Sequence, residues 1–238
     1  MGINKKDNYL FINTSADFKT FDITDKANPV ELNALFLKSF LWYGLTVSGN
    51  YAYIGTGANG IAILDISNPA SPSTKASIPV GNYSYNADVS GDYIFVADEN
   101  AGFVIYNTSN LKTPIELFNY NKTNTVKIKV KDVLIDGNFA YLSANYDGLI
   151  IYDISDINNP QKLGVYKTGW WIDNAVIYKN YVFTAYSNSG LIVVDATDKS
   201  NPIYHSKISG VSPRRLFFKD NFLYVARSRG FSIYSVRL

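Results

Sequence analysis

At residues 49–53 the chain reads Gly49-Asn50-Tyr51-Ala52-Tyr53, a two-residue turn that leads into a strand with aromatic residues at alternate positions. A turn of this length suits a tight β-hairpin. We call this turn and its first aromatic residue the marker. It occurs six times, at Asp7-Asn8-Tyr9, Gly49-Asn50-Tyr51, Gly91-Asp92-Tyr93, Gly137-Asn138-Phe139, Lys179-Asn180-Tyr181 and Asp220-Asn221-Phe222. Successive markers are 42, 42, 46, 42 and 41 residues apart, so the sequence predicts six repeats of one structural unit.

Each repeat contains four predicted strands. The first strand precedes the marker, as at residues 44–47, and the second follows it, with Tyr51 and Tyr53 on one face because alternate strand residues point the same way. A Gly-bearing turn leads to the third strand, as at residues 61–66. A proline such as Pro72 then begins the fourth strand, because proline is tolerated at the start or edge of a sheet. We expect the aromatic residues of the second strands to pack between neighbouring sheets.

Four antiparallel strands repeated at this period are typical of the blades of a β-propeller. The sequence therefore predicts an all-β fold: one β-propeller domain over residues 1–238, with six four-stranded blades and no helical element. The terminal blades are expected to lack strands, because residues 1–6 look too short for a first strand and little chain follows the third strand at residues 233–236. An exposed sheet edge there could pair with another chain, which predicts an edge-mediated oligomer.

Two third strands share a motif, Gly148-Leu-Ile-Ile-Tyr-Asp153 and Gly190-Leu-Ile-Val-Val-Asp195. Degenerate copies are Phe18-Lys-Thr-Phe-Asp22 and Phe231-Ser-Ile-Tyr-Ser235, where the final Asp is replaced. These repeats resemble the LVIVD-repeat β-propeller family over nearly the whole chain. The resemblance implies a surface or secreted protein of poorly defined activity, so we expect an extracellular or cell-surface location and otherwise a cytoplasmic one.

Composition excludes several classes of partner and chemistry. The chain is 47% hydrophobic and 18% charged with a formal net charge of +2, so neither nucleic acid nor an acidic membrane surface is expected as a partner. Membrane insertion is not expected either, because no run approaches the roughly 18 apolar residues that span a bilayer. Cysteine is absent, which excludes disulfides and thiol chemistry.

An acidic or amide residue recurs at the end of the third strands, as Asp22, Asp65, Asn107, Asp153 and Asp195. A ring of metal-binding carboxylates is one interpretation. We favour a structural turn, because Asp and Asn side chains both accept hydrogen bonds from nearby backbone N–H groups and Asn107 supplies no carboxylate. We therefore expect no metal and no cofactor.

Catalytic residues are sparse. The single histidine, His205, falls on a predicted outer strand, and Asp98-Glu99 lie in a turn where solvated side chains are the simpler interpretation. Lys127, Lys129 and Lys131 share one face of an extended segment, which favours a solvated strand face over an anion site. No catalytic residue is assigned, and an enzyme is less expected than a binding protein.

The variable positions fall in the connection from the fourth strand of one repeat to the first strand of the next. This connection and the turn between the second and third strands open on the same end of a propeller, and we call that end the loop face. All three tryptophans occur in the fourth-to-first connections. The predicted ligand-binding residues are Trp42, Tyr43, Tyr83, Tyr85, Asn86, Asp132, Trp170, Trp171, Asn174, Arg214 and Arg215. Aromatic rings beside amide, carboxylate and guanidinium groups could bind a sugar or a protein loop, although closing the top of the core is the alternative role.

The sequence thus favours a non-enzymatic binding or interaction scaffold that recognises a protein or glycan ligand through the loop face. A hydrolase, lyase or lactonase-like enzyme with its site in the axial channel is the second hypothesis, and a structural spacer is the third. A cluster of histidine or carboxylate side chains in the channel would favour the enzyme, whereas an exposed aromatic surface would favour binding.

Overall fold

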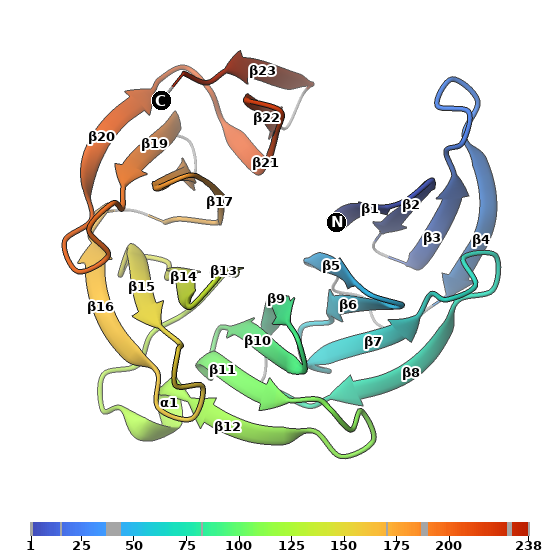
Figure 1. Cartoon of the computed structure of the whole chain (residues 1–238), viewed down its shortest axis with the longest axis horizontal. Coiled ribbons are helices and arrows are strands. Elements are labelled where there is room, and N and C mark those ends of the chain that lie inside the picture. Colours follow the sequence, from blue (N-terminus) through green and yellow to red (C-terminus); the bar gives the residue numbers. More distant parts are fainter. Residues whose placement is uncertain are drawn as a thin grey trace. The chain divides into compact units, whose positions relative to one another are not determined.

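Every marker turn joins the first two strands of a separate antiparallel sheet in the computed structural model. The structure describes residues 2–14, 16–36, 44–81, 83–169, 171–186, 190–227 and 230–237. The fold is an all-β propeller of six blades, five with four strands and the last with three (Figure 1). The chain divides into two units, residues 1–129 and 130–238, which are described in turn.

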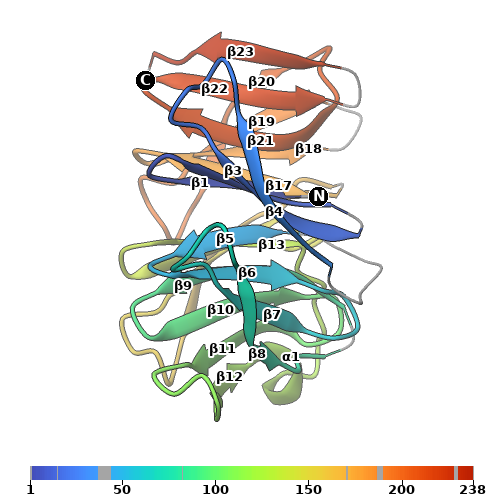
Figure 2. The ribbon, with the colours of Figure 1, turned by 90° about the vertical axis from the view of Figure 1, so that its right-hand side faces the viewer.

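The first unit contains three four-stranded sheets with the strands in chain order across each sheet. Blade 1 consists of β1 (Gly2–Lys6), β2 (Tyr9–Asn13), β3 (Asp17–Asp22) and β4 (Val30–Phe36); β1, β3 and β4 are labelled in Figure 2. Blade 2 consists of β5 (Leu45–Ser48), β6 (Tyr51–Gly55), β7 (Ile61–Asp65) and β8 (Ser73–Ile78). Blade 3 consists of β9 (Ser84–Ser90), β10 (Tyr93–Asp98), β11 (Gly102–Asn107) and β12 (Ile115–Asn119).

The second unit repeats this order in two complete blades and one incomplete blade. Blade 4 consists of β13 (Asp132–Asp136), β14 (Phe139–Ser143), β15 (Leu149–Asp153) and β16 (Gln161–Tyr166). Blade 5 consists of β17 (Asn174–Tyr178), β18 (Tyr181–Tyr186), β19 (Gly190–Asp195) and β20 (Ile203–Ile208). Blade 6 consists of β21 (Pro213–Lys219), β22 (Phe222–Arg227) and β23 (Phe231–Ser235).

The two ends of the chain differ from each other. The prediction that residues 1–6 cannot form a first strand is wrong: β1 pairs with β2 along its whole length, from Gly2 opposite Asn13 to Lys6 opposite Tyr9. Five residues are enough for a first strand, because the first strands of the blades range from four residues in β5 to seven in β9 and β21. The prediction of an incomplete last blade is confirmed, since the sheet containing β23 has three strands among the described residues.

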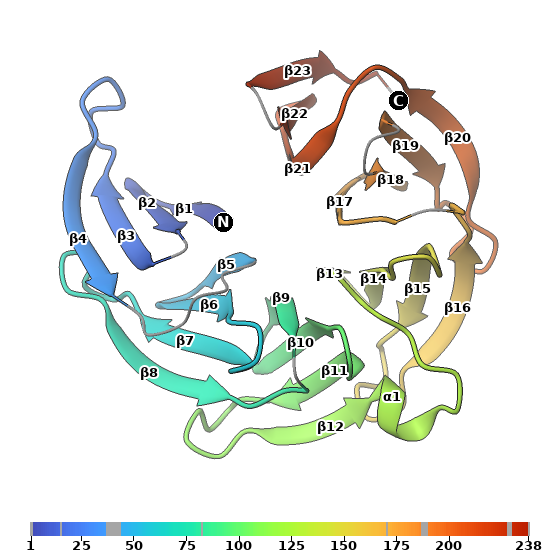
Figure 3. The ribbon, with the colours of Figure 1, turned by 180° about the vertical axis from the view of Figure 1, so that it is seen from behind.

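A short helix, α1 (Tyr120–Thr123), was not predicted. It follows β12 in the repeat that is four residues longer than most others (Figure 3). The Asn119 side chain accepts a hydrogen bond from Lys122 N at 3.2 Å, which caps the helix. The extra residues thus close on themselves as one helical turn, and the strand pattern continues unchanged in β13.

The hydrophobic core consists of layers between neighbouring blades. Tyr53 of blade 2 packs with Ala87, Ile94 and Val96 of blade 3. The same arrangement recurs between blades 1 and 2, 4 and 5, and 5 and 6, where aromatic side chains such as Phe183 meet aliphatic residues of the following blade. The predicted burial of the aromatic positions is confirmed for the second such residue in blades 1 to 5, namely Phe11, Tyr53, Phe95, Tyr141 and Phe183. It is wrong for blade 6, where Phe222 and Tyr224 are 42% and 37% exposed.

Candidate binding face

Within each unit, the turn between the second and third strands of a blade lies against the connection that leads to the next blade. Gly57 and Ser84 form a two-way backbone bridge, with N–H···O distances of 3.2 and 3.1 Å. Asn145 and Ile172 are bridged at the corresponding place in the second unit. These bridges bring the two kinds of connection together, so side chains from both can contact one ligand.

In the first unit, the loop face carries a tyrosine pair linked to an ion pair. The rings of Tyr83 and Tyr85 are 6.3 Å apart, and Tyr83 is partly exposed whereas Tyr85 is buried. The Tyr85 hydroxyl donates to the Glu99 carboxylate, which also pairs with Lys129 at 2.7 Å. Only Tyr83 of these two tyrosines presents a broad surface to solvent.

Asp98, next to Glu99, stabilises the turn that follows it by accepting hydrogen bonds. It is fully buried; one carboxylate oxygen accepts from the backbone N–H groups of Asn100 and Ala101 at 2.8 and 2.7 Å, and the other accepts from the Ser84 hydroxyl at 2.8 Å. The expectation of a solvated side chain is therefore wrong for Asp98, because its buried carboxylate accepts hydrogen bonds that hold the turn.

The lysines that follow α1 also have partners in the protein. Lys129 pairs with Glu99, and the Lys127 ammonium donates to the carbonyl of Asn124 at 2.8 Å. Ile128 between them is buried while both lysines are exposed, which confirms the predicted alternation. The exposure of both lysines agrees with a solvated face, but the segment precedes β13 and is not part of a strand, so the expectation of a strand face is wrong.

The polar residues near the end of the fourth-to-first connections, such as Asp132 and Asn174, are more deeply buried than predicted. In the first unit, the Asn86 side chain occupies the space that a Cβ on Gly44 would need, which explains glycine at that position. In the second unit, Asp132 accepts from Asn174 Nδ2 at 2.7 Å and from Ala175 N at 3.2 Å. Asn174 Oδ1 in turn accepts from Leu216 N at 2.9 Å.

These hydrogen bonds join blade 4 to blade 5 and blade 5 to blade 6. Asp132 and Asn174 are only 1% and 8% exposed, so we assign them to blade-to-blade contacts. Their binding of a ligand stays a prediction.

Trp171 is the predicted residue that most clearly faces solvent. It is 45% exposed, and its ring meets the ring of Tyr146 edge-on at 5.4 Å, with Tyr146 60% exposed. Tyr146 lies on the turn between β14 and β15, beside the Asn145–Ile172 bridge, and buried Ile172 anchors the other side. The pair is therefore a solvent-facing aromatic platform on two connections that are hydrogen-bonded to each other.

Beside this platform, Tyr186 donates its hydroxyl proton to Thr168 O at 2.8 Å, and burial raises the pKa of this tyrosine. The hydroxyl thus holds the connection that carries Trp171. Tyr146 was missed in the sequence because only the fourth-to-first connections were compared; its place two residues before Gly148, in a turn on the same end, was the available signal.

The remaining predicted residues are distributed differently. Arg214 lies at an irregularity in the pairing of β21 with β22, and Arg215 lies opposite Ala226, on the side of blade 6 that faces away from blade 5. Trp42, Tyr43 and Trp170 lie outside the described residues.

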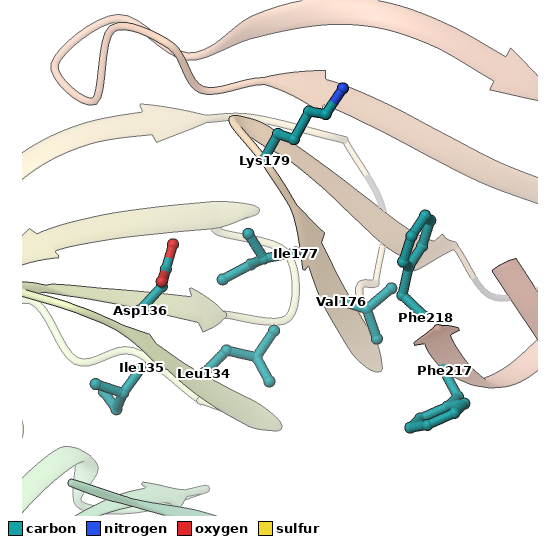
Figure 4. A pocket seen from close by; sticks show the side chains of 8 residues that line it. All are labelled: Leu134, Ile135, Asp136, Val176, Ile177, Lys179, Phe217 and Phe218. Carbon is teal, nitrogen blue, oxygen red and sulfur yellow. The ribbon is translucent and has the colours of Figure 1, made fainter. Parts of the chain in front are cut away.

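A groove of about 520 Å³ lies along the first strands of the second unit (Figure 4). Its walls are mainly apolar and come from β13, β17 and β21, with Asp136 and Lys179 as its charged groups. The complete lining is Leu134, Ile135, Asp136, Val176, Ile177, Lys179, Phe217 and Phe218. This composition suits packing or an apolar ligand better than acid–base chemistry, which needs paired titratable groups.

The recurrent Asp and Asn at the ends of the third strands cap turns, as predicted. Their side-chain oxygens accept from the backbone N–H two residues later, at 2.7–3.0 Å for Asp22, Asp65, Asn107, Asp153 and Asp195. Among the described residues, no three histidine, cysteine or acidic side chains are grouped closely enough to hold a metal ion. No helix in the described part of the chain combines the length and hydropathy that a membrane span requires.

The model of the LVIVD repeat matches four segments of the chain, residues 43–79, 81–122, 129–168 and 173–208. The chain belongs to the LVIVD-repeat family. The matched segments cover most of blades 2 to 5, and blades 1 and 6, with the degenerate motifs, fall outside them. No curated protein matches the chain.

Solved structures share the fold of this LVIVD-repeat protein at low sequence identity. A protein from Lactobacillus plantarum has a TM-score of 0.78 at 13% identity, over 100% of this chain and 80% of its own. The β-propeller domain of Cps50 (Swd1) from Myceliophteria thermophila has a TM-score of 0.81 at 9% identity, over 99% and 82%. The computationally designed protein Ika8 has a TM-score of 0.70 at 13% identity, over 98% and 70%. These similarities concern the fold alone.

Proposed function

We propose that this LVIVD-repeat propeller is a binding module that recognises a protein or glycan ligand through its loop face, with Trp171 and Tyr146 as the anchor. The single observation that carries the proposal is the exposure of both rings, 45% and 60%, on connections joined by a backbone bridge. Large rings that stay exposed while their backbone is fixed can bind with little loss of conformational entropy. An extracellular or cell-surface location is part of this proposal.

Tyr83 extends the proposed surface in the first unit, because it is the ring exposed at the position that corresponds to Trp171. Arg214 is exposed and could add a charged contact. The buried residues Tyr85, Asp132 and Asn174 would then support the loop face from beneath rather than touch the ligand.

The test is to screen the chain on an immobilised glycan array and in a pull-down, and to repeat the positive binding with Trp171→Ala and Tyr146→Ala. Each variant should bind roughly tenfold more weakly, because an aromatic anchor contributes more than about 1 kcal/mol. Melting temperatures should stay near that of the wild type, since both side chains are largely exposed.

Tyr204→Ala is the matched control, since Tyr204 is 54% exposed on the outer strand β20 and should leave binding unchanged. If both anchor variants bind as well as the wild type, recognition lies elsewhere. If neither screen detects binding, the result would favour the structural-spacer hypothesis over the binding module.

A further inference from the structure

The aromatic platform of blades 4 and 5 is a corner between two ring faces rather than a flat surface. The rings of Trp171 and Tyr146 meet at 69° with their centroids 5.4 Å apart. Both rings are exposed, and the Asn145–Ile172 bridge fixes the backbone that carries them. The face of an aromatic ring is negative, so it attracts a cation that lies within about 6 Å of the ring centroid. The corner presents two such faces to one small group.

Two carboxylates accompany the rings. Asp147 directly follows Tyr146 in the turn between β14 and β15. Asp173 lies two residues after Trp171, and the bridged Ile172 between them is fully buried, so Trp171 and Asp173 share the outer side of this extended segment. Among the described residues, neither carboxylate has an ion-pair or hydrogen-bond partner. Both are therefore available to a cation from another molecule.

The fold of the repeat does not require these side chains. The corresponding turn and connection of the first unit are held by the same kind of bridge, between Gly57 and Ser84. There Ala58 and Asn59 occupy the positions of Tyr146 and Asp147, and Tyr85 occupies that of Asp173. The same backbone arrangement thus forms without the second exposed ring and without either carboxylate.

The charge of the platform also differs from that of its surroundings. Residues 144–148 and 167–173 contain Asp147, Asp173 and one cation, Lys167, which leaves a net charge of −1. The corresponding residues of the first unit, 56–60 and 79–85, contain no charged side chain, and the whole chain has a net charge of +2. The platform is therefore a local acidic site on a slightly basic protein, which favours a cationic ligand.

We propose that the ligand of this platform is a protein that inserts a lysine or arginine side chain into the corner between Trp171 and Tyr146, where Asp147 and Asp173 balance its charge. The inference rests on the proposed function, because it identifies the ligand of the same anchor. A lysine or arginine side chain suits both parts of the site, since its methylene groups pack on the rings while its charged end interacts with the ring faces and the carboxylates. A neutral sugar gains nothing from the negative charge of the two connections.

Saturation-transfer NMR of the full chain tests the requirement for a positive charge. The probes are three acetylated and amidated tripeptides, in which two glycines flank a lysine, an arginine or a glutamine, and methyl β-glucoside represents a glycan. A single side chain makes few contacts, so we expect dissociation constants on the order of 10 mM for the lysine and arginine peptides. The glutamine peptide should bind at least about threefold more weakly, because it cannot form the cation–π contact or pair with the carboxylates.

The double variant Asp147→Asn and Asp173→Asn tests the carboxylates. It should bind the lysine peptide at least about threefold more weakly. Its melting temperature should stay near that of the wild type, because neither side chain holds the fold and Asn59 already occupies the first position in blade 2. Asp220→Asn is the matched control, since it removes an exposed carboxylate from a marker turn, at the opposite end of the strands, and should leave binding unchanged.

The inference is overturned if neither cationic peptide binds, if the glutamine peptide or the glucoside binds as tightly as the lysine peptide, or if the double variant keeps its affinity. A failure of the proposed function gives a different result. A ligand found in the glycan or pull-down screen that binds Trp171→Ala and Tyr146→Ala as tightly as the wild type contradicts the proposed function itself. A ligand that needs both rings but binds the double variant as tightly as the wild type overturns the inference alone.

Discussion

The first residue of each marker turn has a left-handed backbone conformation, which side chains other than glycine adopt at a cost. Gly49, Gly91 and Gly137 have φ between 55° and 57°. Lys179 and Asp220 hold nearly the same φ, 54° and 50°, with a side chain present. The turn therefore tolerates a side chain and favours glycine only through the backbone.

Alanine substitutions at two glycines of blade 4 would distinguish the cost of backbone strain from the cost of a steric collision. Gly137→Ala should lower the free energy of unfolding by about 1 kcal/mol, because φ is 57° and a Cβ would meet no atom within 4 Å. Gly148→Ala should cost on the order of 3 kcal/mol, because φ is 90° and the new Cβ would lie 2.2 Å from the Tyr166 carbonyl oxygen. Urea denaturation of the two variants measures the difference; equal losses would show that the neighbouring strand moves aside at little cost.

For single residues, the sequence predicts which side chains belong to the loop face better than it predicts how deeply each is buried. Trp171 was found because the tryptophans gather in one class of connection. Asp132 and Asn174 occupy the equivalent position near the end of two fourth-to-first connections. A single sequence does not distinguish a polar residue that faces a channel from one that links two blades. Their inter-blade role depends on the separation of neighbouring sheets, which only the three-dimensional structure contains.

Among the elements, the connection from third to fourth strand contains two successive capped turns. The Asp or Asn that ends the third strand caps the first turn, and a second acidic or amide residue three positions later caps another. That second residue accepts from the backbone N–H two residues on, at 2.9–3.1 Å, in Asp25, Asn68, Asn110, Asp156 and Asp198. Only the first of the two turns was predicted.

These turns make folding stability depend on acid pH. Hydrogen bonds from the side-chain hydroxyl and then the backbone N–H of the residue two positions later hold the pKa of Asp65, Asp153 and Asp195 below the ordinary 3.8. A carboxylate whose pKa is lower in the folded chain stabilises the fold above pH 3.8 and loses that effect as pH falls through the lowered value. The melting temperature should therefore fall as the pH decreases below about 4.

The double variant Asp153→Asn and Asp195→Asn tests whether the capping carboxylates cause the loss of stability at acid pH. Asn107 already caps the same turn without a titratable group, so the variant should fold and show a shallower fall in melting temperature at acid pH. An unchanged pH profile would mean that other carboxylates govern acid unfolding.

The strand order within each blade could be predicted because the marker, the glycine turn and the proline are all local signals. The first strand β1 was missed because the few residues before the first marker were judged too short for a strand, whereas five of them pair with β2. Helix α1 was not predicted either. The four extra residues are visible as a longer repeat, but a single helical turn is too short to show helical periodicity.

For the molecule as a whole, stability is distributed blade by blade, because each described layer of the core joins only two neighbouring blades. Six copies of one repeat were sufficient to predict the number of blades. Repetition alone does not reveal that the aromatic positions of one blade differ in burial from the others, and for that reason Phe222 and Tyr224 of blade 6 were expected to be buried.

Blade 6 should consequently be the part of the second unit that opens most easily. Among the described residues, the third strand of blade 6, β23, pairs with β22 alone, whereas the third strand of blade 5, β19, pairs with strands on both sides. Half of the backbone N–H groups of an edge strand point away from its partner, and local opening costs less where few apolar contacts hold the strand. Amide hydrogen exchange at low protein concentration should therefore be faster along β23 than along β19, a comparison matched for position within the repeat. Equal protection of β23 and β19 in the dilute monomer would mean that another segment covers the edge of β23, and the three-stranded last blade would then be incorrect.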